Sequence, residues 1–142
     1  MIAERERAII ADLHRQGFRL TRPRSAVLDA LLASERHLTA AQLHDLAQAA
    51  CPTLSLASVY RTLALLESLG HIQHVHGQDG CQSYVMAPTP HGHQLVCSSC
   101  GMTCAFTECD LTRLIAEIEA RTGFRIDGHI LELNGLCPNC RK

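Results

Sequence analysis

The sequence of 142 residues contains no tryptophan, and aromatic residues make up only 4% of it. A core with so few rings has to be packed mainly from leucine, isoleucine, valine and alanine, which suits helices. No apolar run approaches the roughly 20 residues of a membrane-spanning helix. The first ten residues carry charges of both signs and no apolar segment with a cleavage site. We therefore expect a cytoplasmic protein without a membrane partner.

The chain also lacks a strong net charge, which is −1, so it is not a polycation as a whole. One stretch is nevertheless basic and free of acids, because it contains Arg15, Arg19, Arg22 and Arg24. Such a stretch is either a solvated face or a contact to nucleic acid. What the sequence has in excess is cysteine, eight in all. In a reducing compartment these are better explained as metal ligands than as a disulfide framework.

The first part of the chain shows helical periodicity followed by a hairpin pattern. Helices are predicted over residues 3–16, from an N-cap at Thr21, from an N-cap at Thr39, and from near Ser55 to Gly70. Their expected inward positions in the third and fourth helices are Leu43, Leu46, Ala47, Ala50, Leu56, Val59, Leu63 and Leu66. Two short β-prone segments flank "HGQDG" and predict a β-hairpin. This order predicts a winged helix-turn-helix over residues 1–86.

The segment "APTP", residues 87–90, is the predicted hinge, because its two prolines stop both helices and central strands. Beyond it, "HQLVC" and "MTCAF" predict two strands, followed by a helix capped by Asp110 and ended at Gly123. Residues 124–133 predict a third strand. The overall fold class is therefore α+β, with a second small domain over residues 91–142. A domain of about 50 residues usually needs a metal or oligomerisation for stability.

Four of the cysteines form two C-x2-C pairs, Cys97 with Cys100 and Cys137 with Cys140. Two such pairs supply the four thiolates of a tetrahedral zinc site. Two disulfides or a thioredoxin-like redox pair are the alternatives. The expected compartment disfavours the disulfides, and the first pair lies between two strands instead of at the start of a helix. The sequence therefore favours structural zinc.

The fourth predicted helix has a polar side that suits DNA. Ser58, Tyr60 and Arg61 lie near its N-terminus, opposite the apolar positions. Arginine can bond guanine in a bidentate manner, and serine and tyrosine can contact bases or phosphates. An ordinary amphipathic helix would show the same pattern. The hairpin behind this helix and the arginines before it favour DNA binding.

Several segments together resemble the ferric uptake regulator family. They are "GFRLTRPRSAVLDAL", "HLTAAQLHDL", "LSLASVYRTLALLESLGHI", "HQLVCSSCG" and "GFRIDGHILELNGLCPNC". The resemblance implies a homodimeric, metal-dependent transcriptional repressor with an N-terminal winged helix and a C-terminal α+β dimerisation domain. Within the family, "HILELNGLCPNC" is more similar to the zinc uptake regulators than to the iron sensors.

The resemblance also implies roles for individual residues. It assigns the four paired cysteines to structural zinc, Tyr60 and Arg61 to base and phosphate contacts, and Arg19 to the minor groove. A metal site in the dimerisation domain falls on His91, His93 and His129. Its usual acidic fourth position falls on Thr112, so Asp110, Glu108 and Cys109 are the nearby substitutes.

A second family metal site, at the hinge, departs further from the usual pattern. Gly92 and Gln94 stand where histidines are common, and Val85 or Met86 where an acid or cysteine is common. Of the usual ligands, His37 remains. The hinge site is therefore either rebuilt from His74, His76 and Cys81 with His91 or His93, or it is weak or absent.

The expected function is a zinc-responsive repressor that binds a palindromic double-stranded DNA operator and controls metal-uptake genes. One structural Zn²⁺ and a second, regulatory Zn²⁺ are the expected cofactors. Sensing of Fe²⁺, Mn²⁺ or peroxide is the alternative within the family. A zinc-dependent hydrolase is a remote alternative, because the sequence has no H-E-x-x-H and no evident general base beside an open zinc.

Overall fold

The computed structural model describes residues 2–76, 81–87 and 92–142 of the chain. Five helices and six strands make an α+β fold over these residues, as the sequence predicts. The helices are α1 (Ile2–Arg15), α2 (Arg22–Ala33), α3 (Ala40–Ala47), α4 (Leu56–Ser68) and α5 (Thr112–Thr122). The strands are β1 (Leu38–Thr39), β2 (Ile72–His76), β3 (Gln82–Met86), β4 (His93–Cys97), β5 (Thr103–Phe106) and β6 (Glu132–Gly135).

The helices α2, α3 and α4 begin at side-chain caps that the sequence encodes. Thr21 Oγ1 accepts from the backbone N–H of Arg24, and Ser55 Oγ accepts from that of Ser58. Thr39 forms a complete capping box with Gln42, in which each side chain bonds the other residue's backbone N–H. These bonds satisfy donors that the first turn of a helix leaves unpaired. The predicted starts of α2, α3 and α4 are therefore confirmed.

One apolar cluster joins α1–α4 with residues of β2 and β3. Leu43, Val59 and Leu63 are fully buried in it, as predicted. Leu46 and Leu56 were predicted inward but are 55% and 42% exposed, and Ala50 is exposed as well. Leu56 is the first residue of α4, and side chains tilt toward the N-terminus of a helix, so this one points past the core. In α3, Leu43 and Ala47 take the inward positions one turn apart.

The predicted hairpin exists and is part of a larger sheet. β2 and β3 pair antiparallel, with Ile72 opposite Met86, and β1 adds to the other edge of β3. The two-residue β1 was not predicted, because so short an extended segment has no periodicity to detect. The resulting order is β1-β3-β2, and it places the hairpin against the helices.

The second sheet has the order β5-β4-β6, with β4 and β5 antiparallel as predicted. The third strand was predicted over residues 124–133 but is confined to Glu132–Gly135, where it runs parallel to β4. Asp127 and Gly128 precede it, and both residue types are depleted in strands. The N-cap of α5 is Leu111 and not Asp110, although the Asp110 carboxylate accepts from the backbone N–H of Thr112 at 3.1 Å. Gly123 ends this helix as predicted, with φ of 74°.

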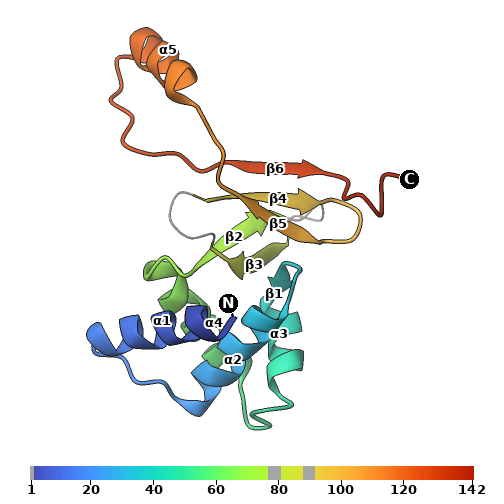
Figure 1. Cartoon of the computed structure of the whole chain (residues 1–142). Helices are drawn as coiled ribbons and strands as arrows, with labels where there is room; N and C mark the ends of the chain where they lie inside the picture. Colours follow the sequence, from blue (N-terminus) through green and yellow to red (C-terminus); the bar gives the residue numbers. More distant parts are fainter. Residues whose placement is uncertain (1, 77–80, 88–91) are drawn as a thin grey trace.

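Figure 1 shows the arrangement of these parts. The helices α1–α4 lie together at one end, the two sheets lie next to each other beyond them, and α5 stands off the second sheet at the far end. No helix in the described part of the chain is long and apolar enough to cross a membrane. The predicted hinge falls mostly on residues 88–90, which lie outside the described residues, so the domain boundaries at 86 and 91 stay predictions.

Candidate metal centres and nucleic-acid interface

The two C-x2-C pairs lie together at the end of the second sheet. Cys97 ends β4, Cys100 lies in the following turn, and the other pair follows β6. Because β4 and β6 run parallel, with Cys97 paired to Gly135, the two strands end at the same end of the sheet, and the two cysteine pairs lie there together. The four sulfur atoms all lie within 4.8 Å of one another. The structure thus gathers the four cysteines that the sequence predicts.

The spacing of these sulfurs fits a tetrahedral zinc ion. Zn–S bonds of about 2.3 Å place the sulfurs of a tetrahedron about 3.8 Å apart. The Sγ atoms of Cys100 and Cys137 are 3.8 Å apart. The backbone N–H of Cys137 also donates to Cys97 Sγ at 3.3 Å, the kind of contact that orients a metal ligand. The four residues therefore suit a zinc ion bound by all of them.

The thiol pKa values show how closely the four groups interact. Hydrogen bonds from the backbone N–H groups of Cys137 and Cys100 lower the pKa of Cys97 to about 6. For Cys140, a hydrogen bond with the Ser99 side chain lowers the pKa, but contacts with the Cys137 and Cys100 thiols outweigh it and raise the pKa to about 12. Ionisation of one thiol in the cluster thus disfavours ionisation of a neighbouring thiol. A divalent cation removes this conflict, because it stabilises every thiolate that it binds.

A second cluster joins His93 on β4, Cys109 before α5 and His129 before β6. The two Nε2 atoms of His93 and His129 are 3.3 Å apart, and Cys109 Sγ is 3.6 Å from His129 Nε2. A tetrahedral zinc ion with Zn–N of about 2.05 Å and Zn–S of about 2.3 Å requires about 3.35 Å and about 3.6 Å for these two separations. Two separations in this cluster therefore match a tetrahedral zinc site, and all three ligand atoms lie within 4.8 Å of one another.

The surroundings of this cluster hold its ligands in place. His93 is buried, and its ring contacts Phe106 of the neighbouring strand with centroids 5.4 Å apart. The His93 and His129 rings are stacked at 4.9 Å. Cys109 was foreseen only as one substitute for the missing acid, and its position next to His129 is what the structure adds. The sequence signal was weak, because 20 residues separate Cys109 from His129.

Other predicted ligands of the regulatory site are not brought to this cluster. The Asp110 carboxylate is engaged at the start of α5, where the Thr112 contacts lower its pKa. Cys81 is exposed and directly precedes β3. The other end of β3, at Met86, contacts Gln94 of β4, next to His93. Cys81 is five residues, or about 16 Å, from Met86 along the strand and therefore far from the His93 cluster. His91 and the side chain of His76 lie outside the described residues. Their role as ligands stays a prediction.

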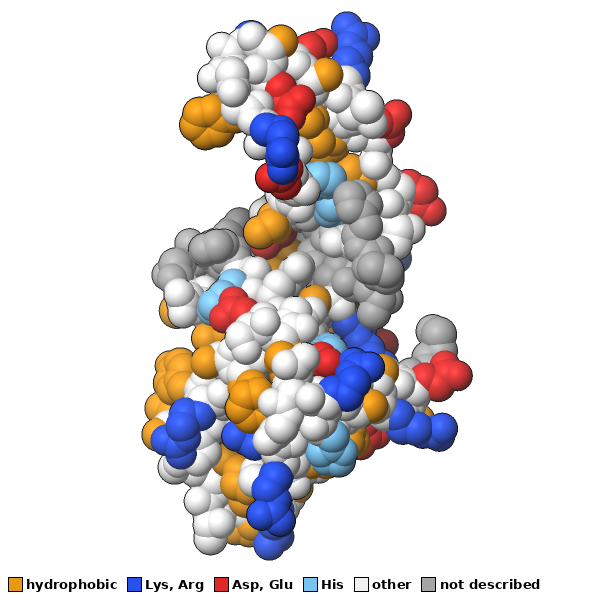
Figure 2. Space-filling view, turned by 90° about the vertical axis from the view of Figure 1, so that its left-hand side faces the viewer, with side chains coloured by type: hydrophobic (Ala, Val, Ile, Leu, Met, Phe, Trp, Pro, Cys, Tyr) orange, Lys and Arg blue, Asp and Glu red, His pale blue; other side chains and the backbone are white. Residues whose placement is uncertain are grey.

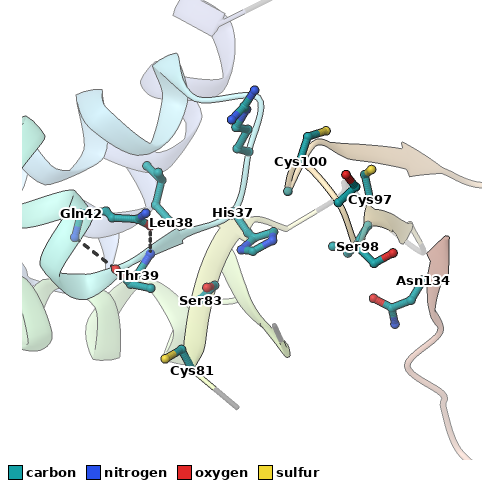
Figure 3. Close-up of a pocket in the computed structure, with 14 residues that line it drawn as sticks. His37, Leu38, Thr39, Gln42, Cys81, Ser83, Cys97, Ser98, Cys100 and Asn134 are labelled. Carbon is teal, nitrogen blue, oxygen red and sulfur yellow. Dashed lines mark hydrogen bonds between the residues drawn. The ribbon is translucent and has the colours of Figure 1, made fainter. Parts of the chain in front are cut away.

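A cavity of about 670 Å³ lies between the first sheet and the four-cysteine cluster (Figure 3). His37, Cys81 and Ser83 line one side of it, and Cys97 and Ser98 line the other. The Nδ1 atom of His37 is buried and has no hydrogen-bond partner among the described residues. His37 is the residue that the resemblance assigns to the hinge site, but the described side chains form no group of three metal ligands around it.

The helix predicted to contact DNA exposes the predicted side chains. Tyr60 is 52% exposed near the start of α4, and Arg61 is exposed next to it. The Arg61 guanidinium donates to Ser58 Oγ at 2.9 Å, and Ser55 Oγ donates to the same oxygen at 3.0 Å. This chain of hydrogen bonds holds Arg61 along the N-terminal turn. The geometry suits a recognition helix that enters the major groove by its N-terminus.

The arginine cluster before α2 divides into two kinds of residue. Arg15 pairs with Asp12 at 2.8 Å, Arg22 donates to the Ala50 carbonyl, and Arg24 donates to the Arg19 carbonyl. These three therefore have local structural contacts. Arg19 is exposed and is not tied by any of these side-chain contacts. On the face drawn in Figure 2, Lys and Arg side chains lie mostly over the lower, helical part.

A winged helix whose α4 exposes Tyr60 and Arg61, joined to a sheet that carries thiol and imidazole clusters, defines the class of metal-binding DNA regulators. The comparison with protein families agrees, because the model of the ferric uptake regulator family matches residues 15–134. The chain belongs to the ferric uptake regulator family. Members of this family are metal-responsive transcription regulators and not enzymes, so the hydrolase alternative is wrong.

Relatives come from both the iron and the zinc branches. The ferric uptake regulation protein of Campylobacter jejuni subsp. jejuni serotype O:2 is 32% identical over 130 residues, or 90% of this chain and 83% of that protein. The zinc uptake regulation protein of Mycobacterium tuberculosis is 33% identical over 125 residues, or 88% and 96%.

Solved structures show the same fold. A zinc uptake regulator complexed with zinc and DNA matches with a TM-score of 0.71 at 26% identity, covering 99% of this chain and 92% of that one. The Helicobacter pylori ferric uptake regulator, whose structure reveals three functional metal binding sites, matches with a TM-score of 0.70 at 19% identity over 100% and 95%. At that identity, the second match supports the fold alone.

Proposed function

We propose that this chain is a cytoplasmic, zinc-responsive DNA-binding repressor that controls metal-uptake genes. The observation that carries the proposal is the cluster of His93, Cys109 and His129. Its Nε2–Nε2 and Sγ–Nε2 separations of 3.3 and 3.6 Å match a tetrahedral zinc ion. A thiolate with two imidazoles is a borderline-soft ligand set, which favours zinc over manganese or iron(II). This cluster is the proposed regulatory site, with His91 as the candidate for a fourth ligand.

A separate structural zinc ion is proposed for Cys97, Cys100, Cys137 and Cys140. The ion would tie the C-terminal tail to the turn after β4 and supply folding free energy to the second sheet. The two sites then have different tasks. A four-thiolate site is closed to further ligands. The histidine-containing site has fewer thiolates, and we expect it to bind zinc more weakly, as a sensor requires.

The proposed DNA contacts are Arg19, Ser58, Tyr60 and Arg61. Arg61 and Tyr60 would meet base edges and phosphates in the major groove, and Arg19 would reach the adjacent backbone or minor groove. A homodimer presents two such helices to a palindromic operator with half-sites about one helical turn, or a multiple of it, apart. The solved zinc uptake regulator complexed with zinc and DNA supports this mode of binding.

Zinc would act by selecting one arrangement of the dimer. A ligand shifts an equilibrium only by its differential affinity for the two states. An almost complete shift from the inactive to the DNA-binding state requires a preference of about 5.5 kcal/mol. Zinc bound to Cys109, before α5, and to His93, on β4, would fix α5 relative to the second sheet.

The test is DNA binding by the full-length protein with zinc retained at the four cysteines and the second site stripped. Operator affinity is measured across buffered free Zn²⁺, Mn²⁺ and Fe²⁺. We expect zinc to restore binding at the lowest free concentration, and Cys109→Ser to raise the zinc concentration required by about tenfold or more. Cys104→Ser is the matched control, since Cys104 is exposed outside both clusters. Binding that is indifferent to zinc would overturn the proposal.

Iron, manganese and peroxide sensing stay as the alternatives within the family. The curated relatives named for ferric uptake support the iron alternative. The same titration separates the candidates, because the sensed metal restores binding first. A peroxide sensor would instead lose DNA binding when peroxide is added to the iron-loaded protein.

A further inference from the structure

The helices α1–α4 and the first sheet, together called the helical unit, contact the second sheet near both ends of β4. The outer contact follows Cys100, where residues 101–103 run beside residues 35–37, the connection from α2 to β1. The backbone N–H of Thr103 donates to the Glu35 carbonyl at 3.0 Å, and the N–H of His37 donates to the Gly101 carbonyl at 3.3 Å. Arg36 and Met102 form a bridge between these two bonds. The turn of the four-cysteine cluster thus pairs directly with the DNA-binding half.

The fit at this outer contact is close. The His37 ring packs against Gly101 so tightly that a Cβ at position 101 would lie 3.2 Å from His37 Nε2. Gly101 also has φ of 74°, a conformation that other residues rarely adopt. Both the backbone path and the absence of a side chain at Gly101 are therefore needed for His37 to lie against the turn.

The inner contact is made by Gln94, which is 3% exposed. Its Nε2 donates to the Met86 carbonyl at the end of β3, 3.2 Å away across the two sheets. Val75, Val85 and Val96 form a small buried cluster that spans the same two sheets. A buried amide is costly unless it is hydrogen-bonded. The bond to Met86 satisfies the Nε2 end of this amide, whereas Oε1 is buried without a hydrogen-bond partner among the described residues. The Nε2 bond favours this register of the two sheets, because any other register would leave that end unbonded as well.

These two contacts restrain the relative orientation of the two parts. Cys97, whose backbone N–H donates to the Met102 carbonyl of the outer contact, is three residues, or about 10 Å, from Gln94 along β4. A single contact would allow rotation about it, whereas two contacts separated by this distance oppose rotation. The described side chains at the inner contact are a glutamine and valines, which are not zinc ligands in proteins.

We infer that protein contacts at both ends of β4 dock the helical unit onto the second sheet, with Gln94 as the positioning residue, and orient the recognition helix without a metal ion between the two sheets. The regulatory metal then acts on the far side of the second sheet, through α5 and the dimer. The consequence for DNA binding rests on the proposed function, whereas the docking itself does not.

The test is hydrogen exchange of the His37 and Thr103 amides in the full-length protein. The sample holds zinc at the four cysteines and is studied in free zinc buffered below and above saturation of the second site. We expect both amides to be protected equally in the two conditions. Protection that requires the second metal would overturn the inference.

Two variants of Gln94 complete the test. Gln94→Glu keeps the shape of the side chain but replaces the N–H donor by a carboxylate oxygen, which cannot donate to the Met86 carbonyl. Gln94→Ala removes the contact. Each should speed exchange of the His37 and Thr103 amides by about tenfold or more. Amides within α2 and between β4 and β5 should stay protected, which would show that the fold is intact. Gln16→Ala, at an exposed position directly after α1, is the control. Exchange at His37 and Thr103 that stays at the wild-type rate in both Gln94 variants would overturn the inference.

The outcome is separable from that of the proposed function. Zinc-independent operator binding would refute zinc sensing and leave the amide measurement to decide the docking. Conversely, loss of docking with intact zinc dependence would refute the inference alone.

Discussion

Single side chains set the chemistry of the two metal-ligand clusters and of the proposed recognition helix. Cys109 supplies sulfur to a site that otherwise consists of imidazoles, and its Sγ is 3.6 Å from His129 Nε2. Cys97 receives backbone hydrogen bonds from Cys137 and Cys100 that lower its pKa to about 6 and so favour its thiolate form. Arg61 is held by Ser58 and not by an acid. The roles of Cys109 and Arg61 can each be tested by one substitution.

Replacing Cys109 with aspartate should change the metal preference of the regulatory site. The softer thiolate favours zinc, and a carboxylate favours harder ions such as Mn²⁺. We expect Cys109→Asp to lower zinc affinity by about tenfold or more and to narrow the gap between zinc and manganese. Competition against a calibrated chelator measures both. The control Cys104→Ser should keep the wild-type metal preference. An unchanged metal preference in Cys109→Asp would show that Cys109 does not bind the metal.

Replacing Arg61 with alanine should weaken operator binding by about 1–3 kcal/mol, because a bidentate base contact is lost. Fluorescence anisotropy with operator and scrambled duplexes measures the loss and shows whether it is specific to the operator. Arg113→Ala is the control, since Arg113 is exposed on α5, where it pairs with Glu117. Equal affinities of Arg61→Ala and wild type would argue against α4 as the recognition helix.

At the scale of elements, side-chain contacts between neighbours fix the winged helix. Asp12 of α1 accepts from Arg15 and from His71, which precedes β2, each at 2.8 Å. This links the first helix to the wing across 59 positions of sequence. His74 on β2 likewise pairs with Glu67 of α4 and contacts the Tyr84 ring. The wing is therefore attached to two helices through its histidines.

The link through Asp12 predicts a dependence of stability on pH. Hydrogen bonds from Arg15 and His71 hold the pKa of Asp12 below its ordinary value. A carboxyl with a lowered folded-state pKa adds stability above its unfolded pKa of about 3.9, and that stability is lost as pH falls through the folded value. We expect Asp12→Asn to be less stable than wild type at pH 6 and to approach it in acid. Urea unfolding at several pH values measures this difference.

Taking the difference between variant and wild type cancels the release of zinc from thiolates in acid, which both proteins share. Asp29→Asn on the exposed face of α2 provides the control and should show a constant offset. A constant offset for Asp12→Asn as well would show that its carboxylate has the same pKa in the folded and unfolded states.

The whole molecule combines a large helical core with a second sheet that has little apolar packing of its own. Among the described residues, none of α5 is buried, and Leu133, Leu136 and Ile130 are 45–93% exposed. Such an exposed apolar surface is typical of an interface with another chain. This agrees with a dimeric regulator whose second half is completed by a bound metal ion and by its partner.

Removal of the structural zinc should therefore unfold the second sheet before the helices. Zinc binding of this kind supplies on the order of 10 kcal/mol of folding free energy. We expect metal-free protein to lose amide protection in β4 and β6 while α2 and α4 keep theirs. Hydrogen exchange after verified removal of zinc tests this, and readdition of zinc should restore protection. Unchanged protection of β4 and β6 would show that the cysteines do not hold the fold.

Local patterns in the sequence determined the helices α1–α4, the caps of α2–α4, the hairpin and the two cysteine pairs. They did so because capping, helical periodicity and C-x2-C turns depend on residues three or four positions apart. Tertiary structure decided the rest. The parallel pairing of β4 and β6, the meeting of Cys109 with His93 and His129, and the bond from Gln94 to Met86 join parts of the chain through the sheets or across them. No local pattern encodes such pairings, since their free energy comes from burial and hydrogen bonds that form only when the sheets assemble.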